Sequence, residues 1–246
     1  MDFKTATLYK KTILTEDTYE FKFKTDLPFT YETAQFVTIK VPSTDGKMLM
    51  RSYSISCSPT QDYFELCVKL LPEGKGSFYL RNLAEGQKIE FLGPSGRFKF
   101  ESPKTIEDAE KKTVFLIATG TGIAPIKAMI EDELAKGSIQ RMHLIFGVRY
   151  IKDVFYREVF EKLAIKHSNF TFDITVSRPE ETVSIPESQS WNMKKGRVTD
   201  ILKELNIDPL HTEAYICGLK EMIEETNTIL LKKRLPEGAI HFERFN

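Results

Sequence analysis

The sequence contains little cysteine. Its 246 residues include three cysteines, Cys57, Cys67 and Cys217, and no two of them form a CxxC pair. This spacing argues against a zinc ribbon or a thioredoxin-like motif. Three thiols also cannot supply the four ligands of an iron–sulfur cluster held by cysteine alone. We therefore expect no bound metal, and a sparse, odd number of thiols is typical of a reducing compartment.

An excess of charge of one sign is also lacking. Lysine plus arginine equals aspartate plus glutamate, 35 against 35, so no bulk basic field would attract nucleic acid. The chain has no apolar run of about 18 residues, the length that spans a bilayer. Its N-terminus lacks the apolar core of a signal peptide. We expect a cytoplasmic monomer with no membrane span and no nucleic-acid partner.

The first hundred residues consist of short strand patterns separated by turn residues. Strands are expected at 21–25, 36–41, 63–70 and 88–92, with one short helix near 78–83. Short strands at this spacing predict a small antiparallel β-barrel. We expect this first domain to cover residues 1–102, and the polar, charged segment 102–112 to be the linker that follows it.

The remainder of the chain alternates strand and helix patterns. Residues 113–118 are almost continuously apolar, as in a strand of a sheet covered on both faces. Further strands are expected at 142–147, 170–177 and 214–217, and helices at 126–134, with Gly137 as its C-cap, 154–167, 198–205 and 221–233. This alternation predicts an α/β domain with a doubly wound parallel sheet over residues 112–246.

A glycine pair follows the first of these strands. Gly120 and Gly122 flank Thr121, and Pro125 fits the first turn of the next helix. Free N–H groups at such a helix start favour a phosphate. However, Pro125 replaces the third glycine of G-x-G-x-x-G, and the chain contains no P-loop. By itself the motif is equally compatible with a tight turn that binds nothing.

Two weaker motifs lie in the first domain. Arg51-Ser52-Tyr53-Ser54 combines a cation that can pair with a pyrophosphate, a flat ring and hydroxyl groups. Gly74-Lys75-Gly76-Ser77 opens the short helix and also suits a phosphate. Taken alone, the first could be a surface strand with an ion pair, and the second a plain hairpin turn.

The order of the motifs is more specific than any one of them. R-S-Y-S at 51–54 is followed by G-K-G-S at 74–77, L-G-P-S-G-R-F at 92–98, G-T-G-I-A-P at 120–125 and Y-I-C-G at 215–218. This succession resembles the plant-type ferredoxin–NADP reductase superfamily, and in particular its bacterial ferredoxin/flavodoxin–NADP reductases. The resemblance implies a flavin-binding barrel followed by a nicotinamide nucleotide-binding domain. It also implies FAD, because FMN-binding members usually show a richer glycine cluster at 74–77.

The resemblance assigns a role to individual residues of the flavin site. Arg51 would bind the pyrophosphate, Tyr53 would stack on the isoalloxazine, and Ser54 would bond near its reactive nitrogen. Backbone atoms of the segment 68–70 would follow the flavin edge. The implied flavin site therefore comprises Arg51, Ser52, Tyr53, Ser54, Val68, Lys69, Leu70, Gly74, Gly76 and Ser77.

The resemblance also implies a nicotinamide site, in which Ser54, Cys217 and Glu243 are the candidate catalytic residues. Its coenzyme contacts would be Gly120, Thr121, Gly122, Pro125, Cys217, Gly218 and Met222. Arg149 and the pair Ser177-Arg178 end two successive predicted strands, and Arg197 could join them. These arginines favour NADPH over NADH because they can bind its additional phosphate, and solvated surface charges are the alternative. Phe245 could cover the flavin, although Asn246 extends past it, and a solvated tail is the alternative.

These expectations combine into an electron-transfer enzyme. The chain would pass hydride between NADPH and FAD, and single electrons to or from a ferredoxin or flavodoxin, with Lys69, Lys75 and Lys99 as a possible docking rim for an acidic carrier. The alternatives are an NADH-dependent flavin reductase or oxygenase reductase component, an electron-transfer subunit of a larger complex, and a dinucleotide-binding regulator. A dinucleotide-binding regulator would not account for the R-S-Y-S and G-K-G-S motifs.

Overall fold

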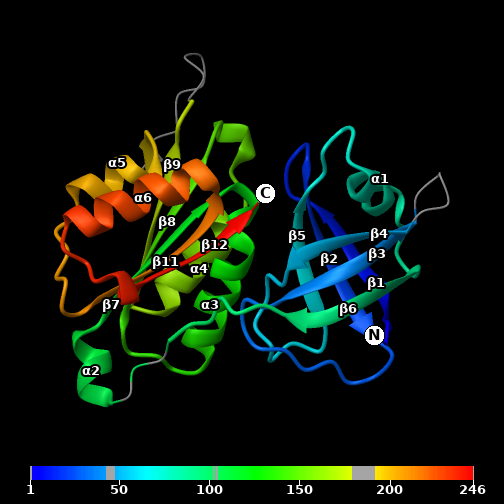
Figure 1. Cartoon of the computed structure of the whole chain (residues 1–246), viewed down its shortest axis with the longest axis horizontal. Helices are drawn as coiled ribbons and strands as arrows, with labels where there is room; N and C mark the ends of the chain where they lie inside the picture. Colours follow the sequence, from blue (N-terminus) through cyan, green and yellow to red (C-terminus); the bar gives the residue numbers. More distant parts are fainter. Residues whose placement is uncertain (1, 43–47, 102, 104, 179–191, 246) are drawn as a thin grey trace.

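The computed structural model describes residues 2–42, 48–101, 103, 105–178 and 192–245. The chain forms two six-stranded sheets in two bodies that lie side by side, with helix α3 (Ile123–Ala135) at the boundary between them (Figure 1). The first sheet is antiparallel and the second is parallel. This arrangement confirms the predicted β-barrel followed by an α/β domain.

The first sheet closes into a barrel. Its strand order is β4-β3-β6-β1-β2-β5, and a bridge between Ile55 and Leu66 joins the two outer strands. Inward-facing residues such as Phe21, Phe23 and Ile39 are fully buried, as strand alternation requires. The strands are β1 (Lys4–Ile13), β2 (Thr18–Thr25), β3 (Phe36–Pro42), β4 (Met48–Ser54), β5 (Phe64–Lys69) and β6 (Lys88–Ser95).

Strand β1 was not expected from the sequence. The pairing of β1 with β2 shifts register between Leu8 and Lys10, which places an irregularity in the middle of the strand. Such a bulge breaks the period-two alternation by which strands are identified. Helix α1 (Lys75–Asn82) begins earlier than the helix expected near 78–83, and its Leu80 belongs to the barrel core.

The segment between the sheets carries local structure. The predicted linker 102–112 contains helix α2 (Ile106–Lys111), whose N-cap Thr105 accepts a hydrogen bond at Oγ1 from the backbone N–H of Asp108, at 3.1 Å. A threonine at this position is a favourable N-cap. Ser102 and Lys104 of the predicted linker lie outside the described residues, and the domain limits 1–102 and 112–246 remain a prediction.

The second sheet is covered on both faces. In β7, Val114 and Leu116 pack into one buried cluster, whereas Phe115 and Ile117 pack into another. One cluster lies under α3 and α4 (Arg157–Lys166), the other under α5 (Val198–Glu204) and α6 (Lys220–Lys232). The order β10-β9-β8-β7-β11-β12 combines β7 (Thr113–Thr119), β8 (Arg141–Val148), β9 (Phe170–Val176), β10 (Met193–Lys195), β11 (Thr212–Leu219) and β12 (Ile240–Phe245).

Two elements of this domain differ from the sequence expectation. Helix α4 begins at Arg157 instead of near 154, because Tyr156 adopts a left-handed conformation with φ of 60° after a 3-10 turn at Ile151–Asp153. The C-terminal residues form β12, parallel to β11, so the solvated tail is wrong. No helix in the described part of the chain is long and apolar enough to cross a bilayer.

The strand order places a crevice at the carboxyl end of β7. The chain leaves β7 through α3 to reach β8 on one side, and β11 pairs with β7 on the other side. Such a reversal of strand order opens a crevice where α/β proteins bind ligands. The turn Gly120–Gly122 lies there, so the glycine motif is at the position where the topology predicts a site.

Candidate functional site

Gly76 brings the two barrel motifs together. A Cβ atom built on Gly76 would lie 2.8 Å from the hydroxyl oxygen of Tyr53 and 3.2 Å from Cγ of Arg51. The start of α1 can therefore approach β4 this closely only because residue 76 has no side chain. The geometry joins R-S-Y-S and G-K-G-S into one surface, as the predicted flavin site requires.

The start of α1 provides donors for an anion. Its N-cap residue, Gly74, has no side chain with which to occupy the first N–H groups of the helix. The hydroxyl oxygen of Ser77 accepts a hydrogen bond from the backbone N–H of Leu71 at 2.9 Å and so fixes the turn that precedes the helix. The Arg51 side chain passes Gly76 with its methylene groups, and its guanidinium donates to the carbonyl oxygen of Met50 at 2.9 Å. Helix N–H groups and an arginine on one surface are a donor set that fits a pyrophosphate.

The residues of β4 divide between its two faces. Arg51 and Tyr53 share the face next to Gly76, whereas Ser52 and Ser54 share the opposite one, because strand side chains alternate. The hydroxyl groups of Ser52 and Thr38 are 2.9 Å apart, so Ser52 contacts β3. Burial raises the pKa of Tyr53, which keeps its phenol protonated. Ser52 is thus not gathered with the phosphate donors.

Strand β5 presents a mixture of buried and paired groups. Val68 and Leu70 are buried, and the backbone N–H of Leu70 donates to the carbonyl oxygen of Asp17 at 2.6 Å. The ammonium group of Lys69 forms an ion pair with Asp17 at 2.8 Å, and Lys99 is paired with Glu32. Two of the three lysines of the expected docking rim, Lys69 and Lys99, are therefore already partnered within the barrel.

The turn after β7 packs against the end of β11. Gly120 has a φ of 53°, a left-handed value that favours glycine. A Cβ on Gly122 would overlap the carbonyl oxygen of Cys217 and lie 2.9 Å from the backbone nitrogen of Gly218. A Cβ on Gly218 would lie 2.5 Å from Cε of Met222. G-T-G and Y-I-C-G, far apart in the sequence, thus form one surface.

That surface leaves a polar group for a ligand. The side-chain oxygen of Thr119 is buried and has no hydrogen-bond partner among the described residues. Gly122 precedes α3 and cannot cap it with a side chain, and Pro125 is buried in the first turn of this helix. The backbone N–H of Ile123 already donates to the carbonyl oxygen of Gly120, and Pro125 has no N–H, so among the described residues the Thr119 hydroxyl is the unpartnered polar group that this turn offers to a ligand.

The barrel and the α/β domain meet at these two surfaces. The ammonium group of Lys127, in the second turn of α3, donates to the carbonyl oxygen of Ser56 at 3.0 Å. Ser56 comes just after β4 and Lys127 just after the Gly120–Gly122 turn. The R-S-Y-S strand and the G-T-G turn therefore lie on neighbouring sides of the domain boundary, as hydride transfer between two rings would require.

One candidate catalytic residue, Glu243, lines a groove at this boundary, and the other two lie in strands beside it. The groove has a volume of about 320 Å³ and is lined by Phe36 and Gly96 of the barrel and by Phe242 and Glu243 of β12. Phe36 pairs with Ser54 in the first sheet, and Glu243 pairs with Cys217 in the second. Ser54, Cys217 and Glu243 thus lie in or directly beside the strands that form the groove.

Burial changes the acid–base properties of two of these residues. It raises the pKa of Glu243 to about 7, and Oε2 of this carboxyl group has no partner among the described residues. Burial, together with the nearby Glu243, holds the pKa of Cys217 well above its usual value. Near neutral pH, Glu243 can take up or release a proton, whereas Cys217 remains a thiol.

The raised pKa predicts a pH-dependent effect of Glu243→Gln. The folded protein binds this proton more tightly than the unfolded chain, whose carboxyl has a pKa near 4.5, so the free energy of unfolding falls as pH rises from 4.5 to 7. Glutamine cannot ionise, so the free energy of unfolding of the variant should exceed that of the wild type by about 3 kcal/mol at pH 8 and by about 1 kcal/mol or less at pH 5. Urea denaturation at both pH values measures the difference.

An exposed glutamate provides the control for this effect. Glu237→Gln, in the 3-10 turn at Glu237–Ala239, should change stability equally at the two pH values. A Glu243→Gln difference that is the same at pH 5 and pH 8 would contradict the raised pKa.

The predicted coenzyme-binding arginines gather at one edge of the second sheet. The backbone N–H of Arg178 donates to the carbonyl oxygen of Arg149 at 2.7 Å, which places the ends of β8 and β9 together. The Ser177 hydroxyl lies 3.4 Å from the carbonyl oxygen of Val148. Arg197 follows β10 and approaches Glu225 at 3.8 Å. The side chains of all these arginines are exposed to solvent at the carboxyl edge.

Phe245 is held within the second domain. It pairs with Leu219 in the β11–β12 ladder and packs against the core under α3 and α4. Asn246, which follows it, lies outside the described residues. The stacking of Phe245 on a flavin therefore stays a prediction.

Sequence reasoning missed a buried polar cluster centred on Lys127 and Glu65. Both side chains are at least 95% buried and form an ion pair across the domain boundary. One signal was available, because Lys127 is the only charged residue between 113 and 130. A single charged residue within an apolar stretch is expected to be buried and paired with another group, although the sequence does not show which residue is the partner. Within the described residues, no group of His, Cys, Asp and Glu could hold a metal ion.

Comparison with known proteins gives consistent matches over both sheets. The model of the oxidoreductase FAD-binding domain matches residues 5–100, and that of the oxidoreductase NAD-binding domain matches residues 116–228. Ferredoxin–NADP reductase B of Sorangium cellulosum (strain So ce56) is 29% identical over 227 residues, which cover 89% of this chain and 86% of that protein.

Two further relatives come from oxygenase systems. The reductase component of phenol 2-monooxygenase from Pseudomonas sp. (strain CF600) is 31% identical over 226 residues, covering 90% of this chain but only 60% of that protein. The chain therefore spans less than two thirds of this relative. The crystal structure of a cytochrome P450 reductase from Amycolatopsis superposes with a TM-score of 0.85 at 26% identity, over 99% of this chain and 70% of that one.

Proposed function

Because the chain belongs to the plant-type ferredoxin–NADP reductase superfamily, with an FAD-binding and an NAD-binding oxidoreductase domain, we propose that it transfers electrons between NADPH and a one-electron carrier protein. The proposed carrier is a ferredoxin or a flavodoxin. The single observation that carries the proposal is the meeting of the R-S-Y-S strand and the G-T-G turn at one domain boundary.

The described residues fit FAD on the barrel side. A close approach that only glycine allows places the donors of α1 beside Arg51 and Tyr53. When bound there, FAD would supply the exchange between hydride transfer and single-electron transfer, and the protein supplies binding and orientation. In this proposal Arg51 and the α1 N–H groups hold the pyrophosphate, and the Tyr53 ring faces the flavin.

The second domain would bind the nicotinamide nucleotide. In this proposal the turn Gly120–Gly122 and the residues Cys217 and Gly218 receive the nicotinamide nucleotide, and Met222 supports Gly218. The buried Cys217 thiol offers an uncharged wall, and Glu243 holds or releases a proton at the groove.

NADPH is the proposed coenzyme. Arg149 and Arg178 are adjacent at the carboxyl edge of the sheet, and Arg197 follows the neighbouring strand. Guanidinium groups pair well with a phosphate, whereas NADH is usually recognised by an acidic residue that binds its ribose hydroxyls. Ser177 stands between the two strand ends and offers a hydroxyl instead.

A second candidate function rests on the oxygenase relatives. An NADH-dependent flavin reductase, or the reductase component of an oxygenase, would use the same flavin and nicotinamide surfaces. The two candidates differ in coenzyme and in electron acceptor, and both can be varied in one experiment.

Anaerobic reduction of the purified protein tests the proposal. The protein should carry bound FAD, and its flavin absorbance should bleach faster with NADPH than with NADH. Addition of oxidised ferredoxin or flavodoxin should then restore the absorbance. Faster bleaching with NADH would favour the second candidate, and a protein that neither contains nor takes up FAD would refute both.

A further inference from the structure

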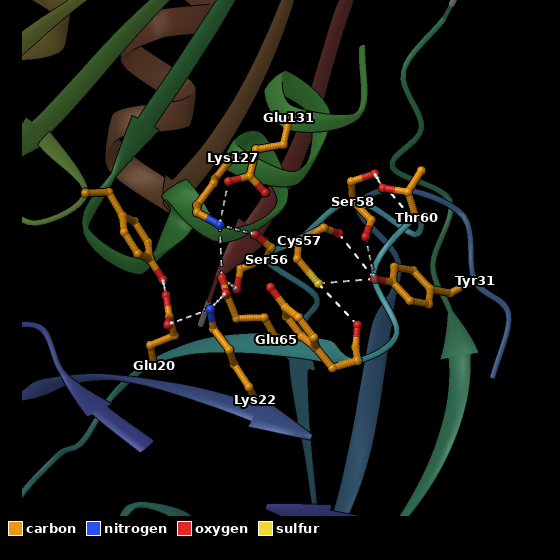
Figure 2. A network of polar contacts seen from close by, with 12 residues as sticks. Glu20, Lys22, Tyr31, Ser56, Cys57, Ser58, Thr60, Glu65, Lys127 and Glu131 are labelled. Carbon is orange, nitrogen blue, oxygen red and sulfur yellow. Dashed lines mark hydrogen bonds and ion pairs between the residues drawn. The ribbon is translucent and has the colours of Figure 1, made fainter. Parts of the chain in front are cut away.

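Two of the most deeply buried charged side chains among the described residues, Lys127 and Glu65, meet between the two domains (Figure 2). The ammonium group of Lys127 on α3 is 3.0 Å from Oε1 of Glu65 on β5, 3.0 Å from the carbonyl oxygen of Ser56 and 2.9 Å from Glu131. Burial alone would lower the pKa of Lys127, but Glu65 and Glu131 raise it, so the lysine remains charged. Its three donors are thus used on partners from both domains.

The cluster continues on the barrel side. Glu65 also accepts a hydrogen bond from the hydroxyl of Ser56 at 2.8 Å and lies 3.3 Å from the ammonium group of Lys22. Lys22 is 3.4 Å from Glu20, whose other carboxylate oxygen accepts a hydrogen bond from Tyr156 at 2.9 Å. Tyr156, just before α4, returns the network to the second domain.

A second connection lies further along α3. Asp132 is almost fully buried, and its carboxylate accepts hydrogen bonds from Ser58 at 3.0 Å and from Thr33 at 2.5 Å, both in the barrel domain. We call the cross-boundary contacts the interdomain clamp. Its members are Lys127, Asp132 and Tyr156 in the second domain and Glu20, Thr33, Ser56, Ser58 and Glu65 in the first.

Stabilisation of the fold does not by itself account for such a buried charged cluster. Taking charges out of water is costly, and replacement of a buried ion pair by apolar residues is often neutral or stabilising. A network with every group satisfied does, however, fix one geometry, because any displacement leaves a buried charge without a partner. Two domains that met only through apolar side chains could shift relative to each other at a lower cost in free energy.

The position of the clamp relates it to the proposed site. Lys127 lies in the helix that begins at the Gly120–Gly122 turn, and Ser56 follows directly on the strand that carries Arg51, Tyr53 and Ser54. A shift of α3 along the barrel would move the nicotinamide surface relative to the flavin surface by the same amount. Misplacement by about 1 Å can lower a reaction rate on the order of 100-fold.

We propose that Lys127 is a positioning residue, which through the interdomain clamp sets the distance between the nicotinamide and flavin surfaces. This inference rests on the proposed function for its effect on hydride transfer. It concerns residues outside both surfaces, so cofactor binding by each domain should survive the loss of the clamp.

The test compares Lys127→Met with Lys111→Met in the FAD-loaded protein. Lys111, on α2, is half-exposed and pairs with Glu107, so its replacement is a matched control outside the clamp. For Lys127→Met, we expect unchanged FAD content and an unchanged half-saturating NADPH concentration in anaerobic stopped-flow reduction. The limiting rate of flavin reduction should fall roughly 10- to 100-fold, and the long-wavelength absorbance of the stacked rings should weaken.

Hydrogen exchange gives a readout that does not depend on catalysis. Peptides covering α3 and residues 56–69 should exchange faster in Lys127→Met than in the wild type, and not in Lys111→Met. If Lys127→Met does not fold, Tyr156→Phe removes one hydroxyl from the clamp and keeps its packing. Tyr156→Phe should speed exchange in the same peptides to a smaller extent and should lower the limiting rate of flavin reduction a few-fold.

The outcomes separate the two proposals. Wild-type exchange and wild-type limiting rates in the clamp variants would overturn the positioning role. A wild-type protein that neither NADPH nor NADH reduces would instead refute the proposed function, and the exchange data would still decide whether Lys127 couples the domains.

Discussion

Gly122→Ala is expected to slow reduction by NADPH at least 100-fold while FAD remains bound. The added Cβ would overlap the carbonyl oxygen of Cys217 and lie 2.7 Å from its carbonyl carbon. Both atoms are backbone atoms of a central strand and cannot rotate away as a side chain could. Overpacking of this kind costs typically about 1–3 kcal/mol, and here the strain falls on the proposed nicotinamide surface.

The expected effect is confined to the second domain. The flavin surface is built from β4 and α1, which the substitution does not touch, so FAD content and the flavin spectrum should match the wild type. Gly238→Ala is the matched control, because a Cβ at residue 238 meets no atom within 4 Å. Stopped-flow reduction of both variants measures the effect, and a Gly122→Ala rate close to that of Gly238→Ala would contradict the assigned role of this turn.

Arg51→Ala is expected to weaken FAD binding roughly 10- to 100-fold. A hydrogen bond to a charged group contributes about 1.5–3 kcal/mol, and each 1.4 kcal/mol corresponds to a factor of ten in affinity. The Arg51 side chain is exposed on β4 beside the start of α1, so its removal leaves the barrel core intact. Equilibrium titration of the apoprotein with FAD, followed by flavin fluorescence, measures the loss.

Arg141→Ala provides the comparison for Arg51. Arg141 is an exposed strand arginine of the second domain, where it contacts Thr113 and the carbonyl oxygen of Lys111. Its replacement should leave FAD affinity unchanged. If Arg51→Ala also retains FAD with wild-type affinity, the pyrophosphate is bound elsewhere on the barrel.

Local sequence patterns were sufficient for the class of fold. The continuous apolar run at 113–118 indicated a strand buried on both faces, and the structure places its alternate residues in two separate cores. Gly137 was expected to end a helix, and it follows the last turn of α3 with a φ of 77°. Such signals depend on neighbours along the chain, which the sequence gives directly.

The same patterns were insufficient where long-range contacts decide the conformation. Residues 240–245 form a strand only because β11 offers an open edge for parallel pairing. Helix α4 begins late because Tyr156 is left-handed, in a position where its hydroxyl donates to Glu20 in the other domain. Neither partner is near in sequence, so no local rule could have identified them.

By itself, the sequence determined a barrel followed by a doubly wound domain, and it identified the glycine, arginine and serine motifs by residue type and order. Tertiary structure alone decided that Gly76 lies against Tyr53, that Gly122 lies against Cys217, and that Lys127 joins α3 to Glu65. The physical reason is that turns and periodic burial are encoded within a few residues. Contacts between distant segments depend instead on strand order and on how two closed cores pack together.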